Sequence, residues 1–328
     1  MRRLVAVLGI TGLAAAALLY AQDRPIFRVK VDMVVLGFTV TDSKGRYVTG
    51  LKPKDFRITE DGIVQKLSTF AEGNKPPVQV MEDGSTQPIV TAGNAGSGPV
   101  ADRSDAFVGT NVFVLFDTSN YMYRGFVYAS DAIADFVRGL DRADSVAVYT
   151  YSRNLTRAAI LSRDRNDAIS GLRKAVAGDD SALYSSLLLT LRDAAKVPGR
   201  KVVIVFSNGP DNASKIAPDN VRAVAEDEGI PIYVISTNEV NKDAISSGVF
   251  RRISTRTGGK AYFAKTWQKQ VEAFEDIRED LVNSYSITYY PQPNPNEGFR
   301  KITVEIPGDT GKKYRVRARP GYRPRGGF

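Results

Sequence analysis

Residues 110–121, Thr-Asn-Val-Phe-Val-Leu-Phe-Asp-Thr-Ser-Asn-Tyr, are the most informative stretch of this chain. Val112–Phe116 is an unbroken apolar run, which is typical of a strand buried on both faces at the centre of a parallel sheet. The run stops at four small polar residues, Asp117–Asn120, whose side chains all carry oxygen. In open α/β sheets, ligands bind just beyond the carboxyl ends of the strands. The stretch therefore places a carboxylate and two hydroxyl groups where such a fold binds its ligands.

The composition of the chain excludes several classes of site. The absence of cysteine rules out disulfide bonds, zinc–thiolate sites and thiol nucleophiles. The absence of histidine rules out Ser-His-Asp and Cys-His nucleophilic sites and most transition-metal sites. Among metals, this leaves hard cations on oxygen ligands. No convincing acid–base pair is present, so we expect the protein not to be an enzyme.

The N-terminus is typical of a secretory signal peptide. Arg2 and Arg3 precede a mostly apolar stretch, Leu4–Leu19, and Ala21 suits the position before a cleavage site. The stretch is short for a membrane-spanning helix, and the alternative is an uncleaved membrane anchor. Removal of residues 1–21 takes away two positive charges and lowers the formal net charge from +9 to +7, which does not indicate a nucleic-acid partner. We expect a periplasmic, cell-envelope or secreted protein, in contact with membrane only through this segment or the envelope.

Residues 22–72 predict a set of short strands. Apolar and charged side chains alternate from Phe27 to Val31, Val34–Val40 is apolar and β-branched, and Glu60-Asp61-Gly62 is a hairpin signal. Such spacing is typical of a β-sandwich. Residues 73–108 are rich in Gly, Pro and Ser and predict a flexible linker.

Strands and helices alternate over residues 109–284, which predicts an α/β domain. The expected strands are Val112–Phe116, Ser145–Tyr151, Lys201–Ser207, Ile230–Ser236 and Ala261–Phe263. The expected helices are Phe126–Leu140, Asn166–Val176, one through Leu183, Leu187 and Leu191, one from Pro218 to Gly229, Asp243–Thr257 and Thr266–Asn283. Repeated βα units predict a doubly wound, mostly parallel central sheet with helices on both faces.

Residues 285–328 return to the two-residue period of strands, for example at Tyr285, Ile287 and Tyr289. Three strands are too few for an independent core, so we expect them to pair with the strands of residues 22–72. The α/β domain would then be inserted in a β-sandwich formed by both ends of the chain. The alternating Arg315, Arg317 and Arg319 indicate a solvated strand face, with attraction to acidic polysaccharide or lipid headgroups as the alternative.

Three groups of motifs carry a family resemblance: the strand that ends in Asp117-Thr118-Ser119; the segments Thr257–Phe263 and Phe274–Leu281; and the flanks Val40–Gly45, Asp55-Phe56, Glu60-Asp61-Gly62 and Arg317–Tyr322. Together they resemble a von Willebrand factor type A (VWFA) domain, and the whole chain after the signal peptide resembles the VWFA-related proteins common in Acidobacteria. The resemblance implies a metal-ion-dependent adhesion site. In the family this site has the pattern D-x-S-x-S, a Thr from a later loop and an Asp after another central strand.

The resemblance assigns that site residue by residue. Asp117 and Ser119 match the family pattern, and Ser181 keeps a hydroxyl group where the family has Thr. Tyr121 stands in place of the second Ser, with a side chain too long to place its oxygen there. Asn208 replaces the Asp and removes a negative charge. The implied site, Asp117, Ser119, Ser181 and Asn208, is therefore degenerate, and we expect Mg²⁺ (or Mn²⁺ or Ca²⁺) to bind weakly or not at all.

The functional prediction follows from this edge of the sheet. We expect an adhesion or assembly module that binds a protein partner through an acidic side chain of the partner, with an edge formed by Tyr121, Tyr123, Asp179, Asp180 and Asp211. The alternative is a structural cell-envelope component with a vestigial, metal-free site. For Asp117 itself, a structural alternative is the capping of a turn or helix. A haloacid-dehalogenase-like phosphotransferase is disfavoured, because Ser119 stands where that class needs a second Asp. The sequence does not indicate an oligomeric state.

Overall fold

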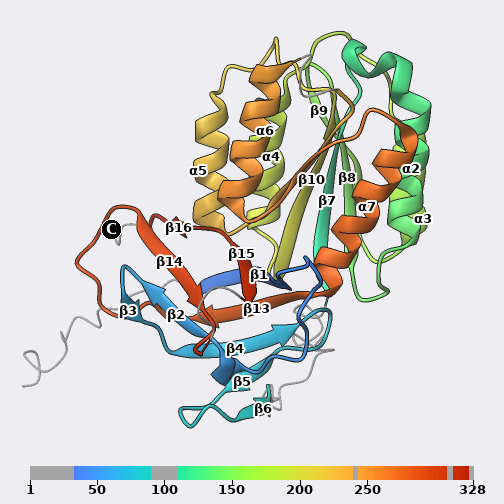
Figure 1. Ribbon diagram of the computed structural model, residues 1–328. Helices are drawn as coiled ribbons and strands as arrows, with labels where there is room; N and C mark the ends of the chain where they lie inside the picture. The colour runs from blue at the N-terminus through green and yellow to red at the C-terminus, as the bar shows by residue number, and fades with distance from the viewer. Residues whose placement is uncertain (1–32, 90–108, 239–242, 309–312, 325–328) are drawn as a thin grey trace, which may run out of the picture. The chain divides into compact units, whose positions relative to one another are not determined.

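The computed structural model describes residues 33–89, 109–238, 243–308 and 313–324 (Figure 1). The predicted signal peptide, the predicted strand Phe27–Val31 and residues 90–108 of the predicted linker lie outside these ranges. Among the described residues, no helix is both long and apolar enough to cross a membrane.

The central sheet of the α/β domain has the strand order β12-β11-β10-β7-β8-β9. Its strands are β7 (Thr110–Asp117), β8 (Ser145–Tyr151), β9 (Leu155–Ser162), β10 (Arg200–Ser207), β11 (Ile232–Ser236) and β12 (Ala261–Phe263). All neighbours are parallel except β8 and β9, which are antiparallel. The sheet is therefore mixed, and sequence analysis missed strand β9. The opening stretch forms β7, which lies between β8 and β10.

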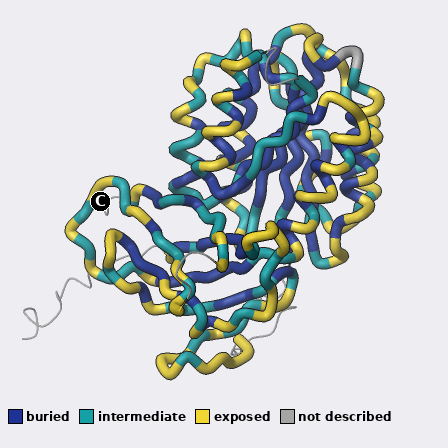
Figure 2. The backbone as a smooth tube through the Cα atoms, in the orientation of Figure 1, coloured by how far each residue is buried: buried dark blue, intermediate teal, exposed yellow. Residues whose placement is uncertain are grey.

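The four inner strands, β7, β8, β10 and β11, are buried on both faces, while the edge strands β9 and β12 are more exposed (Figure 2). One face packs against α2 (Phe126–Arg138), α3 (Arg165–Arg173) and α7 (Trp267–Val282). The opposite face packs against α4 (Leu183–Ala195), α5 (Pro218–Glu228) and α6 (Ala244–Thr257). The all-apolar strands follow from this arrangement, because neither face of the sheet meets water.

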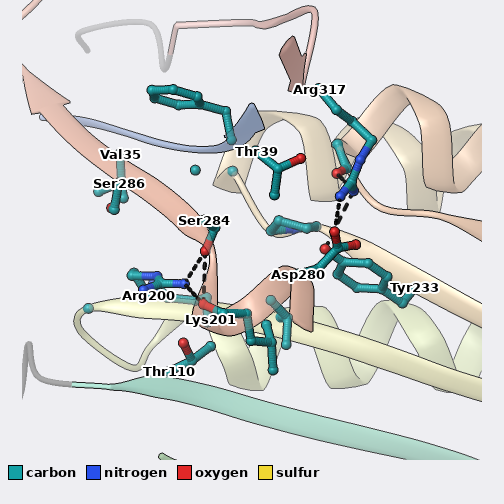
Figure 3. A pocket seen from close by; sticks show the side chains of 18 of the residues that line it. Val35, Thr39, Thr110, Arg200, Lys201, Tyr233, Asp280, Ser284, Ser286 and Arg317 are labelled. Atoms are coloured by element: carbon teal, nitrogen blue, oxygen red, sulfur yellow. Dashed lines mark hydrogen bonds and ion pairs between the residues drawn. The ribbon is translucent and has the colours of Figure 1, made fainter. Parts of the chain in front are cut away.

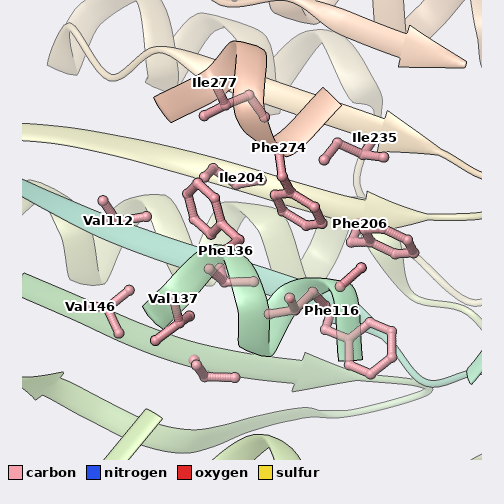
Figure 4. Close-up of a cluster of buried hydrophobic side chains, with 14 of the residues drawn as sticks. Val112, Phe116, Phe136, Val137, Val146, Ile204, Phe206, Ile235, Phe274 and Ile277 are labelled. Atoms are coloured by element: carbon pink, nitrogen blue, oxygen red, sulfur yellow. The ribbon is translucent and has the colours of Figure 1, made fainter. Parts of the chain in front are cut away.

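Aromatic side chains tie helices α2 and α7 to the central strands (Figure 4). The ring of Phe274 on α7 stacks on Phe136 of α2 at 4.8 Å and on Phe206 of β10 at 5.9 Å between centroids. Phe206 in turn meets Phe116 of β7 edge-on at 6.0 Å. Offset and edge-on pairs of this kind add to the free energy gained from burial alone.

Strands from both ends of the chain pair with each other, as predicted, and they form two antiparallel sheets flanking the α/β domain in the sequence. One has the order β15-β1-β13-β4-β5-β6 and the other the order β16-β14-β2-β3. The N-terminal strands are β1 (Val34–Asp42), β2 (Arg57–Glu60), β3 (Ile63–Val64), β4 (Leu67–Glu72), β5 (Val78–Val80) and β6 (Thr86–Pro88). The C-terminal strands are β13 (Ser284–Tyr289), β14 (Arg300–Glu305), β15 (Tyr314–Ala318) and β16 (Gly321–Tyr322). Their apolar side chains share one core cluster, which includes Phe38, Ile58, Tyr285 and Ile302.

The segment predicted as a linker differs from that expectation over its first part. Strands β5 and β6 lie within residues 73–89 and extend the first antiparallel sheet beyond β4. Both are only three residues long, and the Gly- and Pro-rich composition hides such short elements from a search for periodicity.

Buried and half-buried charged side chains join the antiparallel sheets to the amino ends of the central strands, around a small cavity (Figure 3). Arg200 donates hydrogen bonds to the carbonyl oxygens of Gly73 and Leu281 and to the Ser284 hydroxyl. Asp280 Oδ1 lies 2.6 Å from Arg317 Nη2.

The predicted solvated arginine face is wrong at two positions. Arg317 pairs with Asp280 and also donates to the Gly258 carbonyl oxygen. Arg319 is 5% exposed and donates to the carbonyl oxygens of Glu226 and Val35. Arg315 is exposed, whereas Arg317 and Arg319 contact groups of the α/β domain and not water alone.

Candidate functional site

Three neighbouring parallel strands end in polar side chains on the same face of the central sheet. Asp117 of β7 pairs in register with Tyr151 of β8, and Ser207 follows the register pair Phe206–Phe116 on β10. Side chains alternate along a strand, so the odd-numbered residues of these strands all face α4, α5 and α6. The carboxyl edge of the sheet therefore gathers a carboxylate, a phenol and a hydroxyl group.

The Asp117 carboxylate is fully buried and receives three hydrogen bonds from the protein. Its Oδ1 accepts from the Ser119 backbone N–H at 2.9 Å. Its Oδ2 accepts from the Tyr151 hydroxyl at 2.9 Å and from the Ser207 hydroxyl at 2.7 Å. Burial raises the pKa of Asp117, and the hydroxyl groups around it together with the Ser119 amide oppose that rise. The capping alternative for Asp117 agrees with the Ser119 contact, since the side chain closes a turn of its own loop.

The two hydroxyl groups on Oδ2 are well placed to act as donors. The Ser207 oxygen accepts from the Gly209 N–H at 3.1 Å, so its own proton is available to Asp117. Burial raises the pKa of the Tyr151 phenol well above its ordinary value, and the Asp117 charge adds to that rise. The phenol therefore stays protonated and donates. The 3.1 Å distance between the Tyr151 and Ser207 oxygens brings both groups onto one carboxylate oxygen.

Three other oxygens at this edge are buried and make no hydrogen bond of normal geometry with the described residues: Ser119 Oγ, which lies near Asp117, Ser181 Oγ, which lies near Tyr151, and Asn208 Oδ1. The backbone around them is fixed. The Ser181 N–H donates to Asn212 Oδ1 at 2.7 Å. The Asn208 side-chain amide donates to the Tyr121 carbonyl oxygen, which directs its Oδ1 away from that loop. Buried oxygens without a protein partner are satisfied in most proteins by ordered water or by an ion.

The chemistry of this donor set fits a hard divalent cation. Neutral hydroxyl and amide oxygens from Ser119, Ser181 and Asn208 would face the ion, and Asp117 would supply the negative charge. The set is short of negative charge, because Asp117 is its only carboxylate. No group of three or more His, Cys, Asp or Glu side chains that could hold a metal occurs in the described part of the chain. The types of ligand atom therefore suit such an ion, but the set has one carboxylate where the family pattern has two.

The acidic residues predicted to line this edge have other partners. The Asp211 carboxylate accepts from the N–H groups of Tyr184 and Ser214 at 2.9 and 2.8 Å, which places it at the start of α4. Asp180 accepts from the Asn212 side chain at 3.1 Å and lies 3.6 Å from Arg153. The Asp179 side chain is exposed, and its carbonyl oxygen accepts from the Asn120 N–H at 3.2 Å.

The two predicted edge tyrosines lie in the 3-10 helix Asn120–Gly125. Tyr121 is 39% exposed, and its carbonyl oxygen is the acceptor for Asn208. The Tyr123 side chain lies outside the described part of the structure.

Sequence analysis missed Tyr151 and Ser207, the two side chains that contact Asp117 most directly. The available signal was the two-residue period of the strands. When Thr110–Asp117, Ser145–Tyr151 and Lys201–Ser207 are aligned at their carboxyl ends, each ends in a polar group on the same face of the sheet: Asp117, Tyr151 and Ser207. That comparison needed the strand order and register, which only the structure supplies.

Comparison with known proteins identifies the domain. The model of the von Willebrand factor type A domain matches residues 111–279. A search of the curated proteins found no match.

Among solved structures, a von Willebrand factor type A protein from Catenulispora acidiphila is 12% identical, with 77% of this chain and 72% of that chain covered and a TM-score of 0.44. An aerotolerance-related membrane protein from Bacteroides fragilis is 15% identical, with 53% and 98% covered and a TM-score of 0.45. The vWF domain of the type V pili tip protein Mfa5 from Porphyromonas gingivalis is 10% identical, with 53% and 95% covered and a TM-score of 0.45. These scores carry no conclusion about function. The family match covers just over half of the chain, and the chain therefore belongs to the von Willebrand factor type A domain family.

Proposed function

We propose that this protein is an exported, non-enzymatic adhesion or assembly module that captures a protein partner at the carboxyl edge of its central sheet. Von Willebrand factor type A domains commonly mediate protein–protein interactions. The observation that carries the proposal is the set of three unpartnered oxygens beside Asp117, Ser119 Oγ, Ser181 Oγ and Asn208 Oδ1. Buried polar atoms without partners are costly to keep, and a ligand that completes them would offset that cost.

The proposed ligand set is completed in two steps. Asp117, Ser119, Ser181 and Asn208 hold a Mg²⁺ ion, or Mn²⁺ or Ca²⁺, with low affinity because the set contains one carboxylate. A divalent cation bound there would leave a coordination position for an acidic side chain of the partner.

Exposed side chains beside the site would extend the contact. Tyr121, Val127 and Tyr128, at the start of the helical segment after β7, are 39%, 67% and 65% exposed. Aromatic side chains are enriched at protein–protein interfaces, where they contribute large contact areas. Tyr123 and the exposed Asp179 remain part of the proposed edge.

The runner-up is a structural cell-envelope component whose site no longer binds metal. The observation in its favour is that Asp117 already receives three hydrogen bonds from the protein. Both proposals share an export signal in residues 1–21, and the relation to VWFA-related proteins of Acidobacteria is likewise a proposal that rests on sequence motifs. Neither proposal includes a nucleic-acid partner.

The metal part of the proposal is tested by restoring the missing ligands. The double variant Tyr121→Ser, Asn208→Asp returns a short hydroxyl side chain and a second carboxylate to the family positions. We expect it to bind Mg²⁺ about tenfold or more tightly than the wild type in calorimetric titration, because affinity rises with ligand charge. Ser119→Ala should lose the heat of metal binding that the wild type shows. Ser145→Ala, at the opposite end of β8, serves as the control. Equal heats for the double variant and Ser119→Ala would remove metal from the proposal.

Partner capture separates the two candidate functions. The immobilised full chain is exposed to envelope extract with and without EDTA, beside the Ser119→Ala and Ser145→Ala variants. We expect a retained protein that is lost with EDTA and with Ser119→Ala but kept with Ser145→Ala. Retention that neither EDTA nor Ser119→Ala changes would favour the structural component.

A further inference from the structure

The Asp117 carboxylate has almost no acceptor capacity left for a metal ion. An ionised carboxylate offers about four lone-pair positions on its two oxygens. Tyr151 and Ser207 occupy both positions of Oδ2, and the Ser119 N–H occupies one position of Oδ1. One position on Oδ1 remains. A cation at this site would therefore meet a carboxylate that already accepts three hydrogen bonds from the protein.

The hydroxyl group of Tyr151 is held rigidly in this arrangement. The side chain is 1% exposed and packs in the same core cluster as Leu183 and Leu187 of α4. Its backbone carbonyl oxygen accepts from the N–H and the hydroxyl of Thr118 at 2.7 and 2.9 Å, which fixes the end of β8 to the loop that carries Ser119. The hydrogen bond from the phenol to Asp117 is therefore already formed in the folded protein, and a metal ion that binds Oδ2 has to displace it.

We propose that the Tyr151 hydroxyl, together with Ser207, is a built-in counter-ligand that stabilises the Asp117 charge by hydrogen bonds in place of a metal ion and so sets the metal affinity of the site. This inference rests on the proposed function and identifies the residue that tunes it. Asn208 stands where the family has a carboxylate, and this lowers the attraction for a cation. Tyr151 donates a hydrogen bond to Asp117, the one carboxylate that remains. Tyr151 thus determines the affinity of the site for metal, because metal and phenol compete for Asp117 Oδ2.

Tyr151→Phe tests the inference, because it removes one hydroxyl group and keeps the aromatic ring. We expect the dissociation constant for Mn²⁺ and for Mg²⁺ to fall about tenfold or more relative to the wild type, since a hydrogen bond to a charged group no longer has to be displaced. In EDTA the same variant should melt at a lower temperature than the wild type, and added Mn²⁺ should restore the loss. Ser207→Ala, which frees the other position on Oδ2, should change metal affinity in the same direction.

Tyr149→Phe is the matched control. Tyr149 lies two residues earlier on the same face of β8, and its hydroxyl donates to Asp193 at 3.2 Å, away from Asp117. Its removal should leave the metal titration as in the wild type. Equal titrations for wild type, Tyr151→Phe and Tyr149→Phe, including no heat in all three, would overturn the inference. If circular dichroism shows that Tyr151→Phe does not fold, the metal titration of Ser207→Ala decides instead, and a dissociation constant equal to that of the wild type would overturn the inference.

The failure of this inference differs from the failure of the proposed function. The titration uses purified protein and metal alone, without any partner. Tighter metal binding by Tyr151→Phe with no EDTA-dependent capture would support the counter-ligand and reject the partner. Capture that depends on metal, with a titration that Tyr151→Phe does not change, would support the partner and reject the counter-ligand.

Discussion

Asp144 and Asp193 show how burial and partners give two carboxylates opposite effects on stability. Asp144 is 1% exposed and accepts from the Thr110 N–H at 2.8 Å, and burial raises its pKa. Burial would raise the pKa of Asp193 too, but hydrogen bonds from Arg157 and Lys196 outweigh it and lower the pKa. Compared with the unfolded chain, the folded state therefore favours the protonated form of Asp144 and the ionised form of Asp193.

We predict that Asp144→Asn raises the melting temperature at pH 7 and that Asp193→Asn lowers it. A raised folded pKa means that ionised Asp144 costs stability once the pH exceeds its ordinary value of 3.8, whereas the contribution of Asp193 is full above 3.8 and disappears as the pH falls through its lowered pKa. Melting curves from about pH 3 to about pH 8 measure the difference between each variant and the wild type. Both differences in melting temperature from the wild type should become smaller as the pH falls toward about 3. Two variants that shift in the same direction at pH 7 would contradict the assignment.

At this scale, sequence analysis predicted the positions of Asp117, Ser119, Ser181 and Asn208 at the end of β7 and in later loops. It could not predict Tyr151, because a tyrosine that ends an apolar strand looks like core. Whether its hydroxyl meets a carboxylate depends on which strands are neighbours, and that is a non-local property of the sheet.

At the scale of elements, the long periodic segments were predictable and the short or edge ones were not. Helix α5 begins at Pro218 and ends at Gly229, whose φ of 65° is the left-handed conformation that glycine adopts without strain. Strand β9 was missed because one of its sides is exposed, so its sequence lacks the apolar run of β7. Strands β5 and β6 were missed because each is too short to show a period.

Helix α3 and strand β9 are in contact at Gly171, and we predict that Gly171→Ala destabilises the protein by about 1–3 kcal/mol. A Cβ atom there would lie 2.4 Å from the Ala158 carbonyl oxygen and 2.9 Å from Ala159 Cβ, so α3 would have to move off the strand. Gly248→Ala on α6 is the control. Its Cβ would meet nothing within 4 Å, and it should stabilise by about 0.5–1 kcal/mol. Urea denaturation measures both, and equal effects would contradict the steric explanation.

At the scale of the whole molecule, one buried carboxylate links the antiparallel sheets to the α/β domain. The Asp280 side chain is 0% exposed and receives Tyr47 Oη at 2.6 Å, Arg317 Nη2 at 2.6 Å and Lys260 Nζ at 3.2 Å on its Oδ1. Tyr47 and Arg317 belong to the antiparallel sheets and their connections, while Lys260 and Asp280 belong to the α/β domain. Sequence analysis predicted that both ends of the chain pair with each other, but it placed Arg317 in solvent.

We predict that Asp280→Asn lowers the free energy of unfolding by about 3–5 kcal/mol, because it leaves the charges of Arg317 and Lys260 without their buried partner. The control is Arg138→Met, which removes an exposed pair with Asp135 and should cost about 0–1 kcal/mol. Both are measured by urea denaturation at neutral pH. A loss for Asp280→Asn no larger than for Arg138→Met would show that the buried cluster does not link the two parts.

The position of these contacts has a mechanical consequence. The proposed binding edge lies at the carboxyl ends of β7 and β10, and the half-buried Arg200 ties the opposite end of β10 to the antiparallel sheets. A tensile load applied at the edge would run lengthwise along these two strands before it reached the rest of the chain. Their parallel ladder, in register from Thr110 to Phe116, would bear that load in shear, with its hydrogen bonds sharing the force rather than opening one after another.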